Sequence, residues 1–290
     1  MVSSPVPLID RFSSLTARYD ALICDVWGVL HNGARVSPEA EAALGAAREA
    51  GLAVVMLTNA PRMPVDVAGY IRHLGGTRPV WDEIVSSGGV TRKLLAGHGA
   101  RPFYHLGPQR DTSLYAGLAA RPVALEEAEY VLCTGLFDDE TETAEDYRES
   151  LAFMLTRKMD LICANPDSVV ERGHRLIPCA GAIADLYESM GGPVTWIGKP
   201  HPLVYDAARA AIEARLGRSV EKNRILGIGD AIRTDVSGAL AYGIDCLFVL
   251  DGIHSAELGE LGRDFSPAAV DTFLARANVH PTYATVSLKG

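Results

Sequence analysis

The chain has 290 residues, of which 48% are hydrophobic and 22% charged, so it has the composition of a globular protein large enough for two domains. Its net charge is −9 and it has no basic run, which argues against nucleic acid as a main partner, because binding a phosphate backbone needs clustered Lys and Arg. The first twenty residues lack a signal-peptide core, and no apolar run approaches the ~20 residues that span a bilayer. We therefore expect a cytoplasmic protein, with five separated cysteines that are buried and reduced rather than bound to zinc or paired.

Apolar runs of strand length alternate with helical patterns at the start of the chain. The runs Ala21–Cys24 and Leu52–Leu57 are continuous, which suits strands covered on both faces of a parallel sheet. Between them, Ser37 and Pro38 predict the start of a helix that Gly51 ends. A second helix is predicted to open at 63–64 and to end near the glycine pair at 75–76.

The same alternation returns in the last third of the chain. A helix is predicted to run from Pro202 to Leu216, followed by buried strands at Ile225–Ile228 and Cys246–Leu250. The final segment, 281–288, is apolar enough for an edge strand, although a frayed tail would give the same pattern. This order of elements predicts an α/β fold with a doubly wound, Rossmann-like parallel sheet.

The middle of the chain predicts a second α/β domain inserted into the first. It contains strand candidates at 102–106, 130–133 and 161–164 and helix candidates at 89–96, 143–157 and 181–190. Glycine-rich junctions bracket the region, at 75–76 and at 191–193. We therefore assign residues 1–80 and 194–290 to a discontinuous core domain and residues 81–193 to the insert.

Two polar signals follow the first two predicted strands. Asp25 ends the run Ala21–Cys24, and an aspartate at the carboxyl edge of a sheet can attack phosphorus and form an aspartyl-phosphate. A lone aspartate at such a position can also have a purely structural role, as a helix cap or a turn residue. Thr58 and Asn59 end the next strand, where a hydroxyl, an amide and the following backbone N–H groups can hold phosphoryl oxygens, or simply cap a helix.

Two further signals lie in the last third. Lys199 is enclosed by Gly198 and Pro200, and a lysine on such a rigid turn can neutralise developing charge, whereas most lysines are simply exposed. Asp230 ends the strand at 225–228, and Asp235 follows at a predicted helix start. Carboxylates are ligands that Mg²⁺ prefers, so Asp230 fits a direct ligand. Asp235 fits a residue that orients a bound water or Lys199, and equally a helix N-cap.

Together these signals make the chain similar to phosphatases of the haloacid dehalogenase superfamily. The four motifs are Asp25-Val26-Trp27-Gly28-Val29, Thr58-Asn59, Gly198-Lys199-Pro200 and Gly229-Asp230-Ala231-Ile232-Arg233-Thr234-Asp235. The insert of roughly 110 residues between the second and third motifs resembles the class IIA cap of nitrophenyl-phosphatase-like enzymes and of nucleotide and sugar phosphatases. The segment Asn165-Pro166-Asp167 matches a short motif of that cap.

The resemblance implies a role for each motif. Asp25 would be the nucleophile, and Mg²⁺ would be held by the carboxylates of Asp25 and Asp230 and by the backbone carbonyl of Trp27. Thr58, Asn59 and Lys199 would bind the phosphoryl group, with Lys199 also supporting the nucleophile, while Asp235 would act behind the metal ligands. The substrate would be a small phosphorylated metabolite, and the open sheet edge permits a homodimer.

One position departs from the family pattern. Phosphatases of the superfamily usually carry a second aspartate two residues after the nucleophile, where it protonates the leaving group and later activates water. Here that residue is Trp27, whose indole N–H only donates hydrogen bonds. The metal site can survive because it uses the backbone carbonyl, but the acid–base role cannot, and it is typically worth ~10²–10⁴-fold. His31 is the nearest titratable replacement, although a loop or cap contact suits it too, and Trp27 itself can pack on the cap or stack on a substrate ring.

Three functions compete on this sequence. The first is a Mg²⁺-dependent hydrolase of phosphate monoesters. The second is a catalytically weak family member that binds a phosphorylated ligand or a partner, which the loss of the acid favours. The third transfers the phosphoryl group to another acceptor or cleaves a bond other than a phosphate ester. A carbon–halogen dehalogenase needs no magnesium, so Asp230 and Asp235 count against it.

Overall fold

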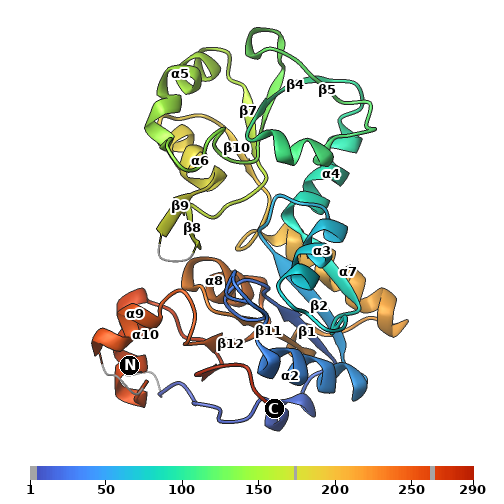
Figure 1. The fold of residues 1–290 in the computed structure, drawn as a ribbon, viewed down its shortest axis with the longest axis vertical. Coiled ribbons are helices and arrows are strands. Elements are labelled where there is room, and N and C mark those ends of the chain that lie inside the picture. The colour runs from blue at the N-terminus through green and yellow to red at the C-terminus, as the bar shows by residue number, and fades with distance from the viewer. Residues whose placement is uncertain (1–4, 173–174, 262–264) are drawn as a thin grey trace. The chain divides into compact units, whose positions relative to one another are not determined.

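The computed structural model describes residues 5–172, 175–261 and 265–290 (Figure 1). The chain forms two compact units. The first comprises Met1–Thr58, Ala68–Ile84 and Tyr205–Gly290, and the second comprises Asn59–Val67 and Val85–Val204. The domain boundaries predicted from the sequence, between 80 and 81 and between 193 and 194, stay a prediction.

The first unit is built on a six-stranded sheet with strand order β13-β12-β11-β1-β2-β3. Its strands are β1 (Ala21–Cys24), β2 (Ala53–Thr58), β3 (Glu83–Ser86), β11 (Ile225–Gly229), β12 (Asp245–Val249) and β13 (Tyr283–Thr285). The pairs β1–β2, β1–β11, β11–β12 and β12–β13 are parallel. This is the doubly wound α/β fold that the alternating pattern predicts, and the segment at 281–288 does supply an edge strand.

Helices connect the strands of this unit. They are α1 (Ser13–Thr16), α2 (Pro38–Glu49), α3 (Pro64–His73), α7 (Pro202–Leu216), α8 (Ser237–Tyr242), α9 (Ser255–Leu261) and α10 (Pro267–Ala277). The start of α2 follows the predicted chemistry, since the Ser37 hydroxyl accepts a hydrogen bond from Ala40 N–H at 3.2 Å. Every residue of β1 and β2 is buried, which explains why their sequences are continuous apolar runs rather than alternating ones.

The second unit has its own five-stranded sheet, with strand order β10-β7-β6-β4-β5. Its strands are β4 (Pro102–Leu106), β5 (Arg121–Pro122), β6 (Tyr130–Cys133), β7 (Asp160–Cys163) and β10 (Val194–Trp196), and its helices are α4 (Ser87–Gly97), α5 (Arg148–Thr156) and α6 (Ala180–Ser189). A separate antiparallel hairpin joins β8 (Val169–Arg172) to β9 (Arg175–Pro178). The inserted region is therefore a second α/β unit, as its pattern predicts.

The structure adds detail that the sequence did not predict. The helix expected at 143–157 begins as a 3₁₀ turn, Ala144–Tyr147, before α5 starts. The strands β3, β5 and β10 and the β8–β9 hairpin were not predicted, because these strands are short and most are partly exposed, so they lack the continuous apolar run that marks β1 and β6. All five cysteines are buried and none forms a disulfide.

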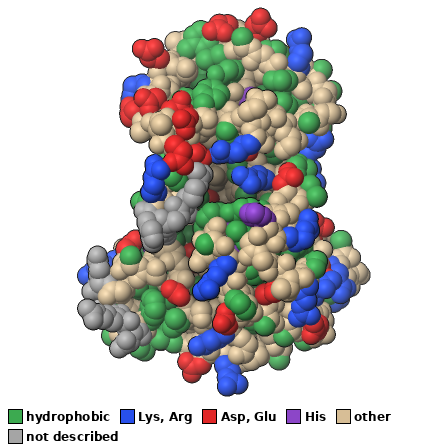
Figure 2. Space-filling model, in the orientation of Figure 1, with side chains coloured by type: hydrophobic (Ala, Val, Ile, Leu, Met, Phe, Trp, Pro, Cys, Tyr) green, Lys and Arg blue, Asp and Glu red, His purple; other side chains and the backbone are tan. Residues whose placement is uncertain are grey.

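The charged side chains are spread over the surface. On the face drawn in Figure 2, Lys and Arg are interspersed with Asp and Glu rather than gathered in one basic stripe. Among the residues that the structure describes, none of the helices has both the length and the apolar character needed to cross a bilayer.

Candidate active site

Two of the predicted site residues follow neighbouring strands of the first sheet. Asp25 comes directly after β1 and Asp230 directly after β11, and these strands pair in parallel with Cys24 opposite Ile228. The backbone N–H of Asp25 donates a hydrogen bond to Ile228 O at 2.8 Å, so the pairing continues through Asp25 itself. Both carboxylates therefore lie at the carboxyl edge of the sheet, where ligands of open α/β folds collect.

A third carboxylate joins them. One ligand oxygen from each of Asp25, Asp230 and Asp235 lies within 4.8 Å of the other two, and we call these residues the carboxylate cluster. Their exposed fractions are only 8%, 4% and 6%. Like charges so close together and so poorly hydrated repel one another, and a cation relieves that repulsion.

The donor set fits a hard divalent cation. All three donors are carboxylate oxygens, and Mg²⁺ binds such oxygens at roughly 2.0–2.1 Å, so oxygens on opposite sides of one ion lie about 4 Å apart. The spacing of the carboxylate cluster is of that size. Softer metals are disfavoured, because among the described residues the cluster contains neither a thiolate nor an imidazole.

Three glycines make room for the carboxylate cluster. A Cβ placed on Gly28, which has φ +91°, would lie 2.1 Å from Asp230 Oδ2, and one placed on Gly252 would lie 2.3 Å from it. A Cβ on Gly229 would lie 2.2 Å from the Cβ of Asp235. Real Cβ atoms do not approach other atoms so closely, so the two aspartates occupy space that only glycine leaves open.

Backbone amides orient the two later aspartates. Ile253 N–H donates to Asp230 Oδ2 at 2.8 Å, and Ala231 N–H donates to Asp235 Oδ2 at 3.1 Å. Asp235 lies within a single π-helical turn, Ile232–Val236, a feature often found at functional sites. An N-cap side chain accepts from a later residue, whereas Asp235 accepts from an earlier one, so it anchors the loop after β11 rather than capping a helix.

Thr58 lies at the same edge of the first sheet. It ends β2, whose Met56 is opposite Cys24, so Thr58 and Asp25 both lie just beyond that pair. Its side chain is buried, with 7% of its surface exposed. The structure therefore brings Thr58 to the edge that carries the carboxylate cluster, as the sequence predicts.

Asn59 and Lys199 lie together in the second unit. The Asn59 side-chain amide donates to Lys199 O at 3.1 Å and to Asp167 Oδ1 at 2.9 Å, while its Oδ1 accepts from Lys199 N–H at 2.7 Å. The Asn59 side chain thus holds the backbone of the Lys199 turn, a role that sequence reasoning missed. Its predicted contact with a phosphoryl group stays a prediction.

The Lys199 turn is also packed tightly. Gly198 has φ +141°, and a Cβ there would lie 2.3 Å from the Cδ of Pro166, so the segment Asn165-Pro166-Asp167 presses against the turn. Lys199 is only 4% exposed, and its peptide bond to Pro200 is cis. The short cap motif and the lysine motif, which are distant in sequence, therefore form one structural feature of the second unit.

Trp27 belongs to an aromatic cluster that also contains His31, Tyr70 and His73. The indole stacks on Tyr70 with ring centroids 6.5 Å apart and meets the edge of His31 at 5.1 Å. A Cβ on Gly33 would lie 2.5 Å from the Cζ2 of Trp27, so that glycine lets the loop close over the indole. Trp27 is accordingly half-buried by its own unit, and Tyr70 is a neighbour that no sequence motif indicated.

His31 is poorly suited to replace the missing acid. It is 4% exposed, and burial lowers the pKa of its imidazole to about 4. Its Nδ1 accepts a hydrogen bond from Gly33 N–H at 3.1 Å, so this nitrogen carries no proton. A histidine in this setting is neutral at neutral pH and holds the loop in shape.

Two residues beside Asp230 were missed by the sequence analysis, namely Gly252 and Ile253. The available signal was the pair Asp251-Gly252, which begins two residues after the strand that ends at Val249, where loops of the carboxyl edge begin. This pair could have been included among the candidate site residues, because the strand before it, β12, was predicted.

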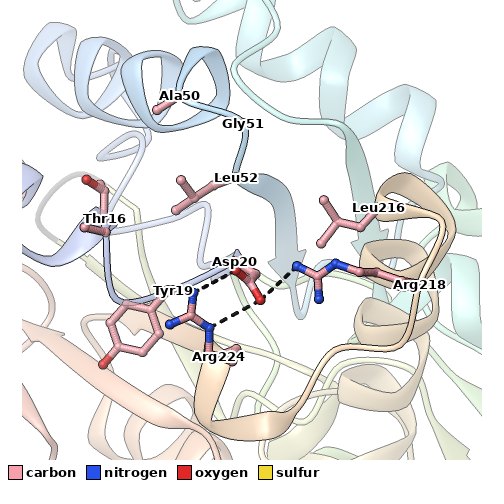
Figure 3. Close-up of a pocket in the computed structure, with 10 residues that line it drawn as sticks. Thr16, Tyr19, Asp20, Ala50, Gly51, Leu52, Leu216, Arg218 and Arg224 are labelled. Atoms are coloured by element: carbon pink, nitrogen blue, oxygen red, sulfur yellow. Dashed lines mark hydrogen bonds and ion pairs between the residues drawn. The ribbon is translucent and has the colours of Figure 1, made fainter.

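A separate pocket of about 420 Å³ opens at the other end of β1 (Figure 3). Asp20 lies between Arg218 at 3.0 Å and Arg224 at 2.8 Å, and its hydrogen bond with Arg224 lowers its pKa to about 2. Asp20 precedes β1 and Asp25 follows it, so at a strand rise of ~3.3 Å per residue they are about 16 Å apart. This pocket is therefore distinct from the carboxylate cluster.

The fold and the carboxylate cluster define a doubly wound α/β protein with an acidic site at the carboxyl edge of its first sheet. Family models agree with that class: one for haloacid dehalogenase-like hydrolases matches residues 22–119, and one for HAD-hydrolase-like proteins matches residues 196–277. A crystal structure of a haloacid dehalogenase-like hydrolase from Brucella suis 1330 is 44% identical, with a TM-score of 0.85, covering 97% of this chain and 100% of that one. The chain belongs to the haloacid dehalogenase-like hydrolase family, so the predicted resemblance is confirmed.

Two curated relatives carry functional names. The D-glycerol 3-phosphate phosphatase of Mycobacterium tuberculosis is 29% identical over 248 residues, which cover 84% of this chain and 66% of that protein. The ribonucleotide monophosphatase NagD of Escherichia coli is 26% identical over 242 residues, which cover 81% of this chain and 89% of that protein. These names agree with the nucleotide and sugar phosphatase branch that the motifs predict.

Proposed function

We propose that this protein is a Mg²⁺-dependent phosphatase that hydrolyses a phosphate monoester of a small metabolite through an aspartyl-phosphate. The observation that carries the proposal is the carboxylate cluster, whose oxygens lie within 4.8 Å of one another in a buried setting at the carboxyl edge of a parallel sheet. The names of the two curated relatives support the reaction class.

In this proposal, Asp25, Asp230 and the backbone carbonyl of Trp27 hold the magnesium ion. When bound, the ion neutralises negative charge on the phosphoryl oxygens and so lets an anionic nucleophile approach. Asp235 lies behind these ligands in the proposal, where its Oδ2 accepts from Ala231 N–H and anchors the loop that follows Asp230. Glycines 28, 229 and 252 keep the carboxylates at this spacing, because any side chain there would displace them.

The nucleophile is Asp25. Its carboxylate attacks phosphorus, and the bond between phosphorus and the leaving oxygen breaks, which yields the aspartyl-phosphate that water then hydrolyses. Thr58 contributes a hydroxyl to the phosphoryl oxygens, and Asn59 and Lys199 complete their binding, with Lys199 supplying positive charge. The two hydrogen bonds between the Asn59 side chain and the Lys199 backbone favour this joint role, because they hold the lysine turn in one conformation.

For the substrate we propose the nucleotide and sugar phosphate class, with the second unit acting as a cap that selects among its members. The two curated relatives are named for a glycerol phosphate and for ribonucleotide monophosphates, which lie in that class or close to it. We also expect a cytoplasmic location and a homodimer as one arrangement that the open sheet edges permit.

One observation favours a second candidate function. The indole of Trp27 is packed on Tyr70 and His31, where the family's phosphatases usually have an acid, so a weakly catalytic binder of phosphorylated ligands or a phosphotransferase is the alternative. Release of inorganic phosphate from a panel of metabolites, with Mg²⁺ and with EDTA, separates these functions. The proposal predicts Mg²⁺-dependent release, whereas ligand binding without release from any member would favour the binder.

A further inference from the structure

The loop that follows the nucleophile contains no side chain able to give up a proton at neutral pH. Between 26 and 36 the titratable side chains are those of His31 and Arg35. Arg35 is exposed, and a guanidinium does not deprotonate in proteins. Trp27, the first large side chain after Asp25, offers only an indole N–H, which donates a hydrogen bond but does not transfer its proton.

Two histidines, His31 in the loop after Asp25 and His254 beside Ile253, accept hydrogen bonds from backbone amides. His31 accepts from Gly33 N–H through Nδ1 at 3.1 Å, and its ring is wedged against Trp27. His254 follows Ile253, the donor to Asp230, and it accepts from Ile232 N–H through Nε2 at 3.3 Å. Its other nitrogen faces Glu257 at 3.3 Å. Because Nδ1 of His31 accepts from a backbone amide, this ring is the neutral imidazole, and its remaining N–H is not acidic enough to protonate a leaving group.

We propose, on the basis of the proposed phosphatase function, that this protein acts on phosphoryl donors whose leaving group departs as a stable anion, such as aryl, enol and acyl phosphates. Alkyl phosphates, whose alkoxide must be protonated as it leaves and which include the nucleotide and sugar phosphates proposed above, are turned over slowly by comparison. The inference follows from position 27, two residues after Asp25, where the family's phosphatases usually carry an acid and this chain carries an indole packed on Tyr70 and His31.

The step balances without an acid. The Asp25 carboxylate attacks phosphorus, and the ester bond breaks with its electron pair passing to the leaving oxygen, which departs as an anion and takes a proton from bulk water afterwards. In the second step, water attacks phosphorus and passes a proton to a phosphoryl oxygen. The bond from phosphorus to Asp25 then breaks, which returns the carboxylate and releases dihydrogen phosphate.

The direct test is the dependence of kcat/KM on the leaving group. A series of substituted phenyl phosphates, extended with acetyl phosphate and glycerol 3-phosphate, is assayed with the wild-type protein and saturating Mg²⁺. Because kcat/KM reports steps up to the first irreversible one, it measures formation of the aspartyl-phosphate and not its hydrolysis. We expect kcat/KM to fall by about fivefold to tenfold for each unit by which the pKa of the leaving group rises.

Two matched variants measure the effect of introducing an acid at position 27. Trp27→Asp and Trp27→Asn remove the same indole and leave side chains of nearly equal volume, but only the aspartate can supply a proton. We expect Trp27→Asp to exceed Trp27→Asn by about 10²–10⁴-fold on glycerol 3-phosphate and by little on 2,4-dinitrophenyl phosphate. Circular dichroism and Mg²⁺ titration of both variants report whether the loop keeps its fold and its metal affinity.

The outcomes distinguish this inference from the function on which it rests. If the wild-type protein releases no phosphate even from the most activated donor, the phosphatase proposal fails. If it hydrolyses the series with a rate that hardly depends on the leaving group, the phosphatase proposal stands and the inference is overturned, because an acid from elsewhere must then act. A steep dependence in the wild type supports the inference even if neither variant folds.

Discussion

The two units of this protein each have a parallel sheet, but their carboxyl edges carry opposite kinds of chemistry. The first edge carries the carboxylate cluster, three buried acids within 4.8 Å of one another. The second carries a network in which Thr134 Oγ1 and His105 Nε2 are 3.0 Å apart, Tyr115 bonds the other nitrogen of His105, and Thr134 also bonds Asp111. Burial raises the pKa of Asp111 to about 6 and lowers that of His105 to about 4, so both neutral forms are favoured.

The difference shows that two sheet edges of similar geometry can have different roles, one suited to binding a ligand and the other to stabilising the fold. Close carboxylates keep their charges only when a cation compensates them, so the first edge is suited to a ligand that arrives from solution. The second network satisfies its polar atoms internally, and burial shifts its two titratable groups toward their neutral forms. The predictions below test this contrast.

The largest effect is expected for the nucleophile. Asp25→Asn retains the size and hydrogen-bonding shape of the side chain but cannot form an acyl phosphate, so kcat should fall by more than about a thousandfold. Phosphate release from an activated aryl phosphate measures the effect, and the thermal unfolding midpoint serves as the control for folding. Turnover near the wild-type level would refute the assignment of Asp25.

The second-largest effect is expected when the space that Gly28 leaves for the Asp230 carboxylate is filled. Gly28→Ala places a Cβ 2.1 Å from Asp230 Oδ2, which must shift the carboxylate, so Mg²⁺ affinity should fall by about 10–100-fold. Gly51→Ala is the matched control, because Gly51 has a similar φ of +97° but nothing within 4 Å of its Cβ position. Isothermal titration with Mg²⁺ compares the variants, and equal loss in both would mean that backbone strain, not the clash, is responsible.

The third prediction concerns the second edge and pH. The pKa of Asp111 is raised from 3.8 to about 6, so the folded protein binds this proton more tightly than the unfolded chain does. Its stabilising contribution is complete below pH 3.8 and is lost as the pH rises through 6. The free energy of unfolding of the wild type minus that of Asp111→Asn should therefore fall by about 2 kcal/mol between pH 4 and 7.

Urea denaturation at several pH values measures that difference, and Asp20→Asn provides its control. The pKa of Asp20 is lowered to about 2, so its contribution is present above pH 3.8 and is lost only as the pH falls toward 2. The free energy of unfolding of the wild type minus that of Asp20→Asn should therefore stay nearly constant between pH 4 and 7. If the difference between the wild type and Asp111→Asn also stayed constant over this pH range, the pKa of Asp111 would not be raised in the folded protein, and the contrast between the two edges would fail.

The smallest effect is expected from the network itself. Thr134→Val removes a hydroxyl that bonds His105 and Asp111, leaving buried polar atoms without a partner, so the free energy of unfolding should drop by about 1–2 kcal/mol. Thr134→Ser keeps the hydroxyl and should lose little. Mg²⁺ affinity should be unchanged in both variants, and a loss of affinity would contradict the division of roles between the two edges.

Much of the fold followed from local pattern. Strands such as β1 and β6 were predicted residue for residue, because a strand buried on both faces must be a continuous apolar run with polar or glycine residues at its ends. The same rule located Asp25 and Asp230, since a charged side chain can only follow such a run, not lie within it. The hairpin β8–β9 and the π turn around Asp235 gave no comparable signal.

By itself the sequence determined the alternation of strands and helices, the family and the residues that end the buried strands of the first sheet, because burial and chain chemistry act along the local chain. Only the tertiary structure decided that Gly252 makes room for Asp230, that Asn59 holds the Lys199 turn, and that Tyr70 and Gly33 enclose Trp27. Each of these is a contact between segments far apart or on different elements, and periodicity does not report which side chain meets which across that distance.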